Sequence, residues 1–399
     1  MKNKLKLGIL VAVAVLWARP SVAQESQIRQ DGQDWVQVVT GTLPAARVLK
    51  VTTPIGSVQV TGGSQKGIQY TVTKRICMGE AEARRQLETF RVSSATRGET
   101  AMIEASAERG RYKRFSVQFT ITVPRELSSL KVETSAGSIG VRNIAGMAAV
   151  STSGGGISLN DIGGNIAAST AGGSIDVGNS NGDVSLETQG GGITLRKVKG
   201  RVTASTAGGS IFVESAEQAV VAETAGGSIN VKQCGGELKA STAGGSLDVG
   251  DVNGAATLET SGGSIRLSSA KGTVKANTAG GGIHLYKLMR GVKAETAAGS
   301  VTVEFVGKPA DFTDSYLSTT VGDVIVYLPP DMKVTVKAVI ETSLGHKIRS
   351  DFPELKVTSE GGDWGPKEMY ASGQINGGGP VLKLHTTLGN IELRKGAKK

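Results

Sequence analysis

The central part of the chain repeats one pattern of apolar and polar residues every 18 positions. In each copy an aliphatic anchor follows a glycine-rich turn, most completely as Thr-Ala-Gly-Gly-Ser at 206–210, 224–228 and 242–246. The anchors are Ile139, Ile157, Ile175, Ile193, Ile211, Ile229, Leu247, Ile265, Ile283 and Val301. A fixed period of this length is typical of a solenoid, in which each repeat is buried by its neighbours.

Each copy predicts two short β-strands. In the copy that begins at Leu247, apolar residues alternate first at Leu247 and Val249 and again at Ala256 and Leu258. Alternation by two indicates a strand with one buried face. Glycine follows the first strand, and a Gly-Gly pair follows the second. We expect these glycines to supply positive φ at tight corners.

Stacking the coils at about 4.8 Å aligns equivalent positions into columns. Counting from the anchor, position 13 is threonine in every copy from Thr134 to Thr296, and we expect this column to face inward and hydrogen-bond along the stack. Position 12 alternates between glutamate and a neutral residue, as in Glu187, Ser205 and Glu223. The alternation separates like charges. It also fits a 36-residue coil made of two copies, although the constant register favours 18.

The flanking segments predict an export signal and two irregular ends. Residues 1–23 form a signal peptide, with Lys2, Lys4 and Lys6 before an apolar stretch and Ser21-Val22-Ala23 before the cut. Residues 24–132 form a β-rich N-terminal cap with one helix over about 79–90, and 133–303 form the regular solenoid. Residues 304–399 form wider terminal coils and a basic tail, continuous with the solenoid. The predicted fold is all-β, a single-stranded β-solenoid (β-helix) of about ten 18-residue repeats.

Charge and cysteine content narrow the class of protein. The chain has 45 basic and 35 acidic residues, and the predicted signal removes four of the basic ones without any acid. Because several of the rest lie in the last six positions, the body is nearly balanced, and we do not expect nucleic-acid binding. Cys234 occupies a column of small apolar residues far from Cys77, so the chain is not a disulfide scaffold. No later segment predicts a membrane span, and no cofactor is expected.

The repeated Thr-x-x-Gly-[Ser/Asp/Asn]-[Ile/Val] phrase, over roughly residues 35–395, resembles a known bacterial family. The closing segments Gly322–Pro329 and Thr387–Ile391 follow the same pattern. They are similar to the putative-adhesin β-strand-repeat proteins, the DUF4097-type domain of unknown function. The resemblance implies a β-solenoid outside the cytoplasm. It carries over no catalytic or binding residue.

Few outward positions are candidates for chemistry. Asp248, Arg266 and His284 fall on consecutive coils and form the best local cluster, which could also be a set of solvated surface residues. Asp176 and Asp248 are four coils apart, about 19 Å, which is too far for a pair of glycosidase carboxylates. Phe212 and Tyr286 are the notable aromatic residues of the repeats. The three histidines have no metal-ligand spacing.

These observations favour an exported, non-enzymatic adhesive or interaction module at the cell envelope, in the periplasm, on the surface or outside the cell. Its partner would be an envelope or surface component, either protein or polysaccharide. Two alternatives stay open. One is a polysaccharide-active enzyme that uses Asp248, Arg266 and His284, and the other is a structural scaffold that self-associates end to end through an imperfect cap.

Overall fold

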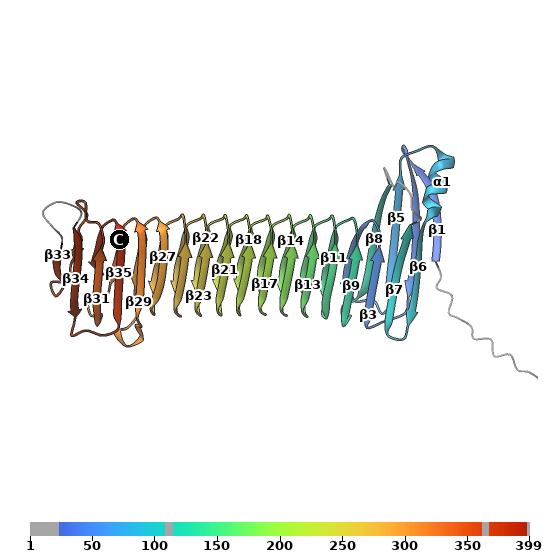
Figure 1. Ribbon diagram of the computed structural model, residues 1–399. Coiled ribbons are helices and arrows are strands. Elements are labelled where there is room, and N and C mark those ends of the chain that lie inside the picture. The colour runs from blue at the N-terminus through green and yellow to red at the C-terminus, as the bar shows by residue number, and fades with distance from the viewer. Residues whose placement is uncertain (1–23, 108–114, 361–366, 397–399) are drawn as a thin grey trace, which may run out of the picture.

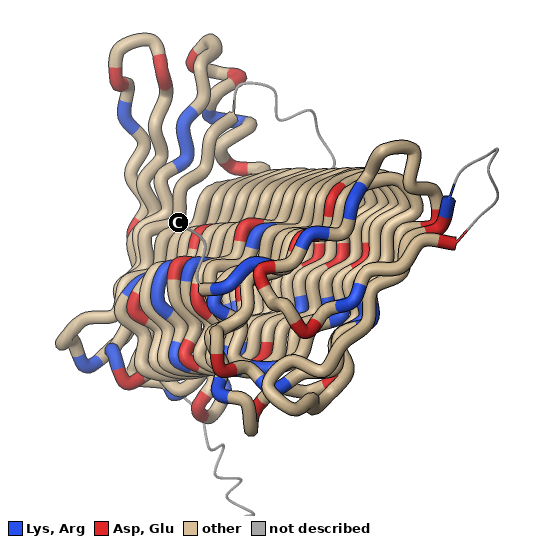
Figure 2. The backbone as a smooth tube through the Cα atoms, turned by 90° about the vertical axis from the view of Figure 1, so that its left-hand side faces the viewer, with Lys and Arg blue, Asp and Glu red and all other residues tan. Residues whose placement is uncertain are grey.

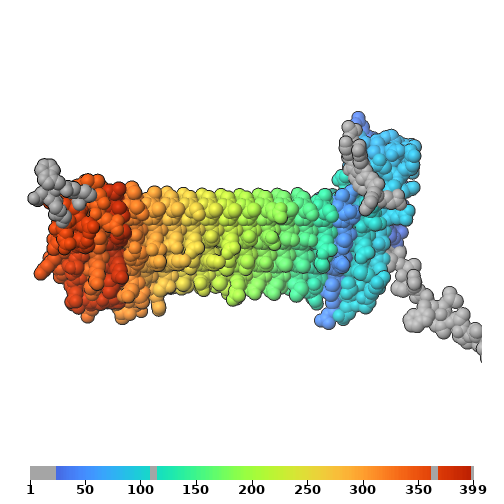
Figure 3. All heavy atoms as spheres, in the orientation of Figure 1, coloured from blue at the N-terminus to red at the C-terminus, as the bar shows by residue number. Residues whose placement is uncertain are grey.

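The computed structural model describes residues 24–107, 115–360 and 367–396, and the predicted signal peptide lies outside these ranges. The chain forms a straight rod of stacked coils with a broader end at each side (Figure 1). Its surface has a nearly constant width between the two ends (Figure 3). No helix in the described ranges has the length and apolar character needed to span a membrane. The fold is the predicted β-solenoid.

Each regular coil contributes one strand to each of two sheets, which we call sheet A and sheet B. The regular strands of sheet A are β10 (Ile139–Ile144), β12 (Ile157–Ile162), β14 (Ile175–Ser180), β16 (Ile193–Val198), β18 (Ile211–Ala216), β20 (Ile229–Cys234), β22 (Leu247–Val252), β24 (Ile265–Ala270), β26 (Ile283–Leu288) and β28 (Val301–Phe305). Those of sheet B are β9 (Ser129–Thr134), β11 (Met147–Thr152), β13 (Ile166–Thr170), β15 (Val184–Thr188), β17 (Val202–Thr206), β19 (Val220–Thr224), β21 (Leu238–Thr242), β23 (Ala256–Thr260), β25 (Val274–Thr278) and β27 (Val292–Ala298).

Strand pairing confirms the 18-residue coil. Ile211 pairs with Ile229 in sheet A, and Thr206 pairs with Thr224 in sheet B, both in parallel register. A 36-residue coil would pair residues 36 apart and leave Ile211 and Ile229 on different faces of one coil, so it is excluded. Between the sheets the aliphatic anchors and their strand partners are almost completely buried, and they form one continuous core along the rod.

The threonine column faces inward as predicted, but its hydrogen-bond partners are glycines. Thr206 Oγ1 donates to the carbonyl of Gly191 in the preceding coil at 2.8 Å and accepts from the N–H of Gly209 at 3.2 Å. The same 2.8 Å bond recurs at every regular coil from Thr152 to Thr296. Each threonine from Thr152 to Thr278 therefore satisfies two backbone groups of a corner.

The positive φ that we expected at the corner glycines occurs at end corners such as Gly137 and Gly299, whereas in the middle of the rod glycine is required for close approach. From Gly155 to Gly281 none of the corner glycines has positive φ. A Cβ on Gly209 would instead overlap the carbonyl oxygen of Gly191 in the coil below. Coils stacked at about 4.8 Å leave no room for a side chain at this corner.

The N-terminal cap continues both sheets in an order that differs from the sequence. Its elements are β1 (Gln24–Asp31), β2 (Asp34–Leu43), β3 (Val48–Thr53), β4 (Ser57–Gly63), β5 (Ile68–Ile76), α1 (Glu80–Thr89), β6 (Phe90–Arg97), β7 (Thr100–Ala107) and β8 (Phe115–Pro124). The coil β3–β4 lies between β7–β8 and β9–β10. Antiparallel strands β5, β2 and β1 extend sheet A, and β6 extends sheet B. Residues 48–63 thus form one more coil of the stack.

Helix α1 lies within the predicted 79–90 and covers the extended part of sheet A (Figure 1). Ala83 and Leu87 pack on Ile76. Beneath the helix, Lys74 is only 3% exposed, and its Nζ donates to Gln37 Oε1 at 2.8 Å and to the carbonyls of Leu87 and Phe90 at 3.1 and 2.5 Å. Burial lowers the pKa of Lys74 to about 8.

At the C-terminal end, too, the order of the strands in the sheets differs from their order in the sequence. Its elements are the 3₁₀ turn η1 (Pro309–Asp311), β29 (Ser315–Val321), β30 (Val324–Leu328), β31 (Val334–Ile340), β32 (Ile348–Ser350), β33 (Lys356–Glu360), β34 (Glu368–Ile375), β35 (Val381–Leu388) and β36 (Ile391–Lys395). The late coil β35–β36 pairs on one side with β29–β30 and on the other with β31–β32. Thr386 Oγ1 donates to Gly322 at 2.9 Å, so the inserted coil keeps the regular corner.

Candidate functional site

The predicted cluster on sheet A is brought together as three neighbouring positions. Asp248 pairs with Arg266, and Arg266 pairs with His284, on the consecutive strands β22, β24 and β26. Asp248 and Arg266 are exposed, and His284 is half-buried. In the described part of the chain Asp248 and Arg266 form no ion pair, and Asp248 Oδ2 instead accepts a 3.4 Å bond from Asn230 Nδ2. The three residues lie on the outer side of a flat sheet.

Phe212 lies in the same outward column but two strands from Asp248. Its ring is covered by Lys232, whose Nζ is 5.3 Å from the ring centroid. The contact is a cation–π pair between neighbouring coils. Phe212 therefore has a structural partner on the rod surface and is separate from the Asp248 cluster.

The outer face of sheet B carries pairs of opposite charge on some of its coils, where position 10 is lysine, at Lys239, Lys275 and Lys293. Lysines at position 10 pair with the glutamates at position 12, as in Lys239–Glu223 at 3.2 Å and Lys275–Glu259 at 2.7 Å. Figure 2 looks along the rod from its C-terminal end and shows basic and acidic positions side by side on the stacked coils. Lysines therefore neutralise Glu223, Glu259 and Glu295 of the predicted glutamate alternation, whereas Glu187 has no basic partner among the described residues.

This pairing stops near the C-terminal end of sheet B, although the lysines continue. Register places Lys293, Tyr316, Lys383 and Lys337 side by side on β27, β29, β35 and β31. We call these four residues the C-terminal lysine row. In the adjacent column Glu295 is followed by Ser318, His385 and Val339, so the acids end. Lys293 still pairs with Glu295 at 3.0 Å, whereas Lys383 and Lys337 have no acidic partner among the described residues.

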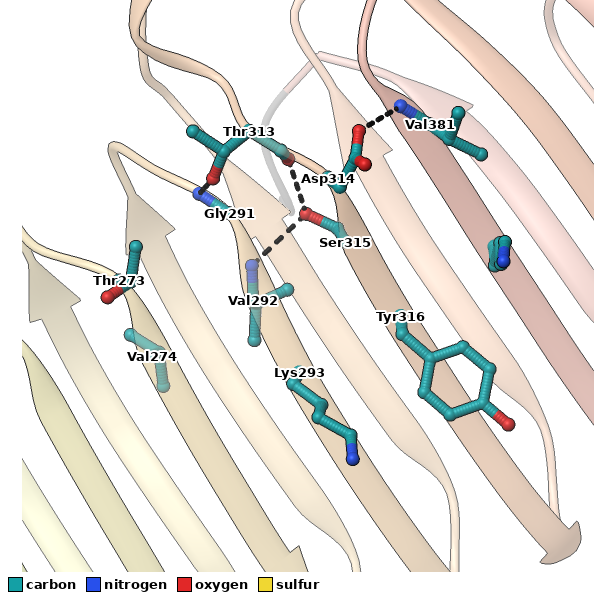
Figure 4. A pocket seen from close by; sticks show the side chains of 11 residues that line it. Thr273, Val274, Gly291, Val292, Lys293, Thr313, Asp314, Ser315, Tyr316 and Val381 are labelled. Atoms are coloured by element: carbon teal, nitrogen blue, oxygen red, sulfur yellow. Dashed lines mark hydrogen bonds between the residues drawn. The ribbon is translucent and has the colours of Figure 1, made fainter.

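A groove of about 520 Å³ lies beside this row, where residues 306–314 are inserted between coils. We call it the C-terminal groove; Lys293, Tyr316 and Lys383 are part of its wall, together with Val381. Figure 4 shows Lys293 and Tyr316 on adjacent strands below the inserted segment. The insertion thus creates a hollow next to Lys293 and Lys383 near the C-terminal end of sheet B.

Side chains at the end of the inserted segment and at the start of β29 bond to backbone groups of the neighbouring strands. Thr313 Oγ1 accepts from the N–H of Gly291 at 3.2 Å, and Ser315 Oγ accepts from the N–H of Val292 at 3.1 Å. Asp314 Oδ1 accepts from the N–H of Val381 at 2.7 Å (Figure 4). These bonds tie the groove to strands on both sides, so its shape is fixed before any ligand binds.

Next to the lysine row, three segments join in a chain of polar contacts. Ser318 Oγ and His385 Nδ1 are 3.1 Å apart, and His385 Nε2 and Glu341 Oε1 are 3.0 Å apart. Thr387 Oγ1 donates to Glu341 Oε2 at 2.7 Å. The bonds from Thr387 and then from His385 lower the pKa of the Glu341 carboxyl. We call Ser318, His385 and Glu341 the histidine relay.

The histidine relay has the serine–histidine–acid order of a serine hydrolase triad, but it lacks the oxyanion hole that acyl transfer also requires. An oxyanion hole needs backbone N–H groups or other donors aimed at one point beside the nucleophile. Ser318 lies inside β29, which is paired with β27 on one side and β35 on the other. The backbone N–H groups of β29 are therefore used in strand pairing. The relay is best described as a polar tie that joins β29, β35 and the end of β31.

The sequence did not reveal the lysine row or the relay. Lys383 and Tyr316 are far apart in the chain and meet only because β35 lies between β29 and β31. The available signal was the Lys–Glu spacing of the regular copies, which could have been followed into the terminal coils. Within the described ranges no three His, Cys, Asp or Glu side chains form a metal-binding cluster, and Cys77 and Cys234 are both free thiols.

Comparison with known proteins gives matches of low similarity. No family model matches the chain, and no curated protein sequence is similar to it, so the resemblance to DUF4097-type proteins stays an expectation. Solved structures that match include a putative cell adhesion protein from Clostridium sporogenes, at 9% identity and TM-score 0.17, covering 94% of this chain and 100% of that one. A putative adhesin from Bacteroides fragilis matches at 14% identity and TM-score 0.26, covering 68% of this chain and 97% of that one. A putative adhesin from Parabacteroides distasonis matches at 12% identity and TM-score 0.25, covering 70% of this chain and 96% of that one. Similarities this low carry no argument about function.

Proposed function

We propose that the protein is an exported, non-enzymatic interaction module of the cell envelope, which binds its partner through the C-terminal groove and lysine row. The observation that carries the proposal is the groove itself. It is preformed, and two of the lysines beside it have no acidic partner in the described structure, whereas the lysines on the sheet B strands of the regular coils are paired with glutamates. The groove gives the rod a defined place for binding near one end, and the long body acts as a spacer.

Export is tested by the mass of the protein recovered after secretion. A cleaved signal gives a mature chain that begins at Gln24, with residues 1–23 absent. Recovery of the intact chain in the cytoplasm only would contradict the proposal, because no envelope partner would then be accessible.

Binding is tested by co-sedimentation of residues 24–399 with isolated cell envelopes. We expect Lys383→Glu with Lys337→Glu to abolish sedimentation, because both substitutions reverse charges beside the groove. The matched control is Arg266→Glu with Lys271→Glu on and beside sheet A, which makes the same charge change away from the groove. Loss of sedimentation in the control alone would assign binding to the Asp248 face instead.

The enzymatic alternative is tested on the residues first named for it. Polysaccharide cleavage by the mature protein that disappears when Asp248, Arg266 and His284 are all replaced by alanine would establish that alternative and refute the proposal. The flat, exposed position of Asp248 and Arg266 gives a substrate no enclosed place to bind, so we expect no cleavage.

Self-association end to end is the remaining alternative, and the end strands argue against it. All five residues of β33 are exposed and include Lys356 and Glu360, and seven of the eight residues of β1 are exposed. Short, charged edge strands oppose pairing with another chain. We expect light scattering to show one species at all protein concentrations, and growth of the particles with concentration would support the scaffold.

A further inference from the structure

We propose that the C-terminal groove and lysine row bind an acidic polysaccharide, which lies across successive strands along the rod with its carboxylates against the lysines. The inference rests on the proposed function and specifies its ligand. It starts from the register of Lys293, Tyr316, Lys383 and Lys337, which occupy four consecutive strands of sheet B. Neighbouring strands are about 4.8 Å apart, so the row is a linear array with regular steps.

The row is electrostatically unfavourable in the free protein. Lys383 and Lys337 are direct neighbours on adjacent strands, and like charges in this position oppose strand pairing. The regular coils also place Lys275 beside Lys293, but there each lysine pairs with a glutamate, at 2.7 and 3.0 Å. The C-terminal coils supply no such glutamate to Lys383 or Lys337 in the described structure. A bound polyanion would neutralise the charges that the fold leaves unpaired.

Tyr316 gives the row an apolar contact between two cations. Its side chain is half-buried, with Lys293 on one side and Lys383 on the other. The carbon–hydrogen face of a sugar ring packs on an aromatic ring, while carboxylates at either side of that sugar reach the flanking ammonium groups. Asp314 is the one acid of the groove wall, and its Oδ1 is already bonded to the N–H of Val381. We therefore place the anion on the lysine side of the groove.

The shape of the site favours a polysaccharide over other polyanions. Single-stranded nucleic acids bind to several aromatic rings on which successive bases stack, and this row offers one ring. A lipid surface would contact a broad basic face, whereas here the cations form a single line. An extended chain of uronic acids advances by about one sugar per strand and presents one carboxylate per sugar, which matches the row.

The test is calorimetric titration of residues 24–399 with polygalacturonate, with its methyl-esterified form as the neutral counterpart. We expect binding of the acid form that weakens with added salt, and no binding of the ester. Lys383→Glu with Lys337→Glu should reduce the affinity at least about tenfold, while Arg266→Glu with Lys271→Glu should leave it unchanged. Tyr316→Ala should weaken binding about three- to tenfold, and Tyr316→Phe should retain it.

Single-stranded DNA and vesicles of anionic lipid are titrated in parallel. Tighter binding of either, equal binding of the ester, or an unchanged affinity in the Lys383/Lys337 variant would overturn the inference. Circular dichroism melting confirms that the variants fold, and the milder pair Lys383→Gln with Lys337→Gln replaces the charge reversal if they do not.

Envelope co-sedimentation distinguishes an error in the ligand class from an error in the binding face. If that sedimentation requires Lys383 and Lys337 but polygalacturonate does not bind, the proposed function stands and the ligand class is wrong. If the Lys383/Lys337 variant sediments like the unmodified protein, the binding face itself is wrong, and both proposals fail.

Discussion

Thr242 and Gly227 belong to successive coils and are joined by a hydrogen bond of 2.8 Å from the threonine hydroxyl to the glycine carbonyl. The same hydroxyl accepts from the N–H of Gly245 at 3.2 Å. The side chain is 5% exposed, so water does not replace either bond if the hydroxyl is lost. This contact makes the corner of one coil depend on the coil below it.

Replacing Thr242 by valine tests the corner bond. Valine keeps the shape of the side chain but leaves two buried backbone groups without a partner, and we expect a loss of about 1–3 kcal/mol in unfolding free energy. Thr242→Ser should lose less. The control is Thr257→Val, because Thr257 faces outward on the next strand of sheet B. Equal stability of the two valine variants, measured by urea unfolding, would show that the hydroxyl has no role in the corner.

Alanine should have different effects on stability at Gly208 and at Gly209, the two glycines of one corner. A Cβ at Gly209 would overlap the Gly191 carbonyl, whereas a Cβ at Gly208 would meet nothing closer than 3.6 Å. We expect Gly209→Ala to cost more than about 2 kcal/mol, because the coils would have to separate locally. Gly208→Ala should be within about 0.5 kcal/mol of the unmodified protein. Similar melting temperatures for both variants would contradict the close-approach explanation.

The pKa of Lys74 makes the stability of the N-terminal cap depend on pH. Its folded value of about 8 lies below the ordinary value of 10.5, so between these pH values the unfolded chain binds more protons. Stability should therefore rise from pH 8 to 10.5, by up to about 3 kcal/mol. Lys74→Met should remove this dependence.

The measurement is urea unfolding at several pH values, followed by the fluorescence of Trp35 in β2. In a protein made as residues 24–399, a Trp364→Phe background leaves Trp35 as the only tryptophan. The informative quantity is the difference in unfolding free energy between the Lys74→Met variant and its parent, since other groups titrate in the same range. Parallel pH profiles for the two proteins would refute the prediction.

The two thiols should differ in reactivity. Cys234 is 2% exposed, and burial raises its pKa, while Cys77 is half-buried. Because the thiolate is the reactive form, iodoacetamide should modify Cys77 first, with Cys234 protected until the coils unfold. Mass spectrometry of the labelled peptides measures both rates. Fast labelling of Cys234 in the native protein would contradict its place in the core.

The regular coils could be predicted from the sequence because every neighbour is 18 residues away. Apolar alternation then identifies the buried positions, and Ile211, Thr206 and Cys234 all occupy the interior as expected. The expectation that the corner glycines have positive φ was wrong for the middle of the rod. Apolar alternation reveals a corner, but it does not show whether the backbone angle or the coil spacing requires glycine there. The distance between coil backbones at Gly209 depends on the finished stack.

The C-terminal face could not be predicted in the same way. Lys383 lies between Tyr316 and Lys337 because a late segment returns into the stack, and no local pattern specifies that return. The sequence placed the best outward cluster at Asp248, Arg266 and His284, where consecutive coils follow consecutive residues. It thus identified the neighbours in the regular region and missed those created by the change of strand order.

The return of β35–β36 into the stack sets the order in which the rod can be completed. Coils of the middle join residues 18 apart, so each can dock as soon as it follows its predecessor. Ser318 and His385 are 67 residues apart, and joining them requires a longer loop to close. The coil before the end must therefore wait, with the edges of β29 and β30 open, until residues 381–395 arrive. A chain cut short before residue 381 would keep those edges, which are the surfaces on which foreign strands add.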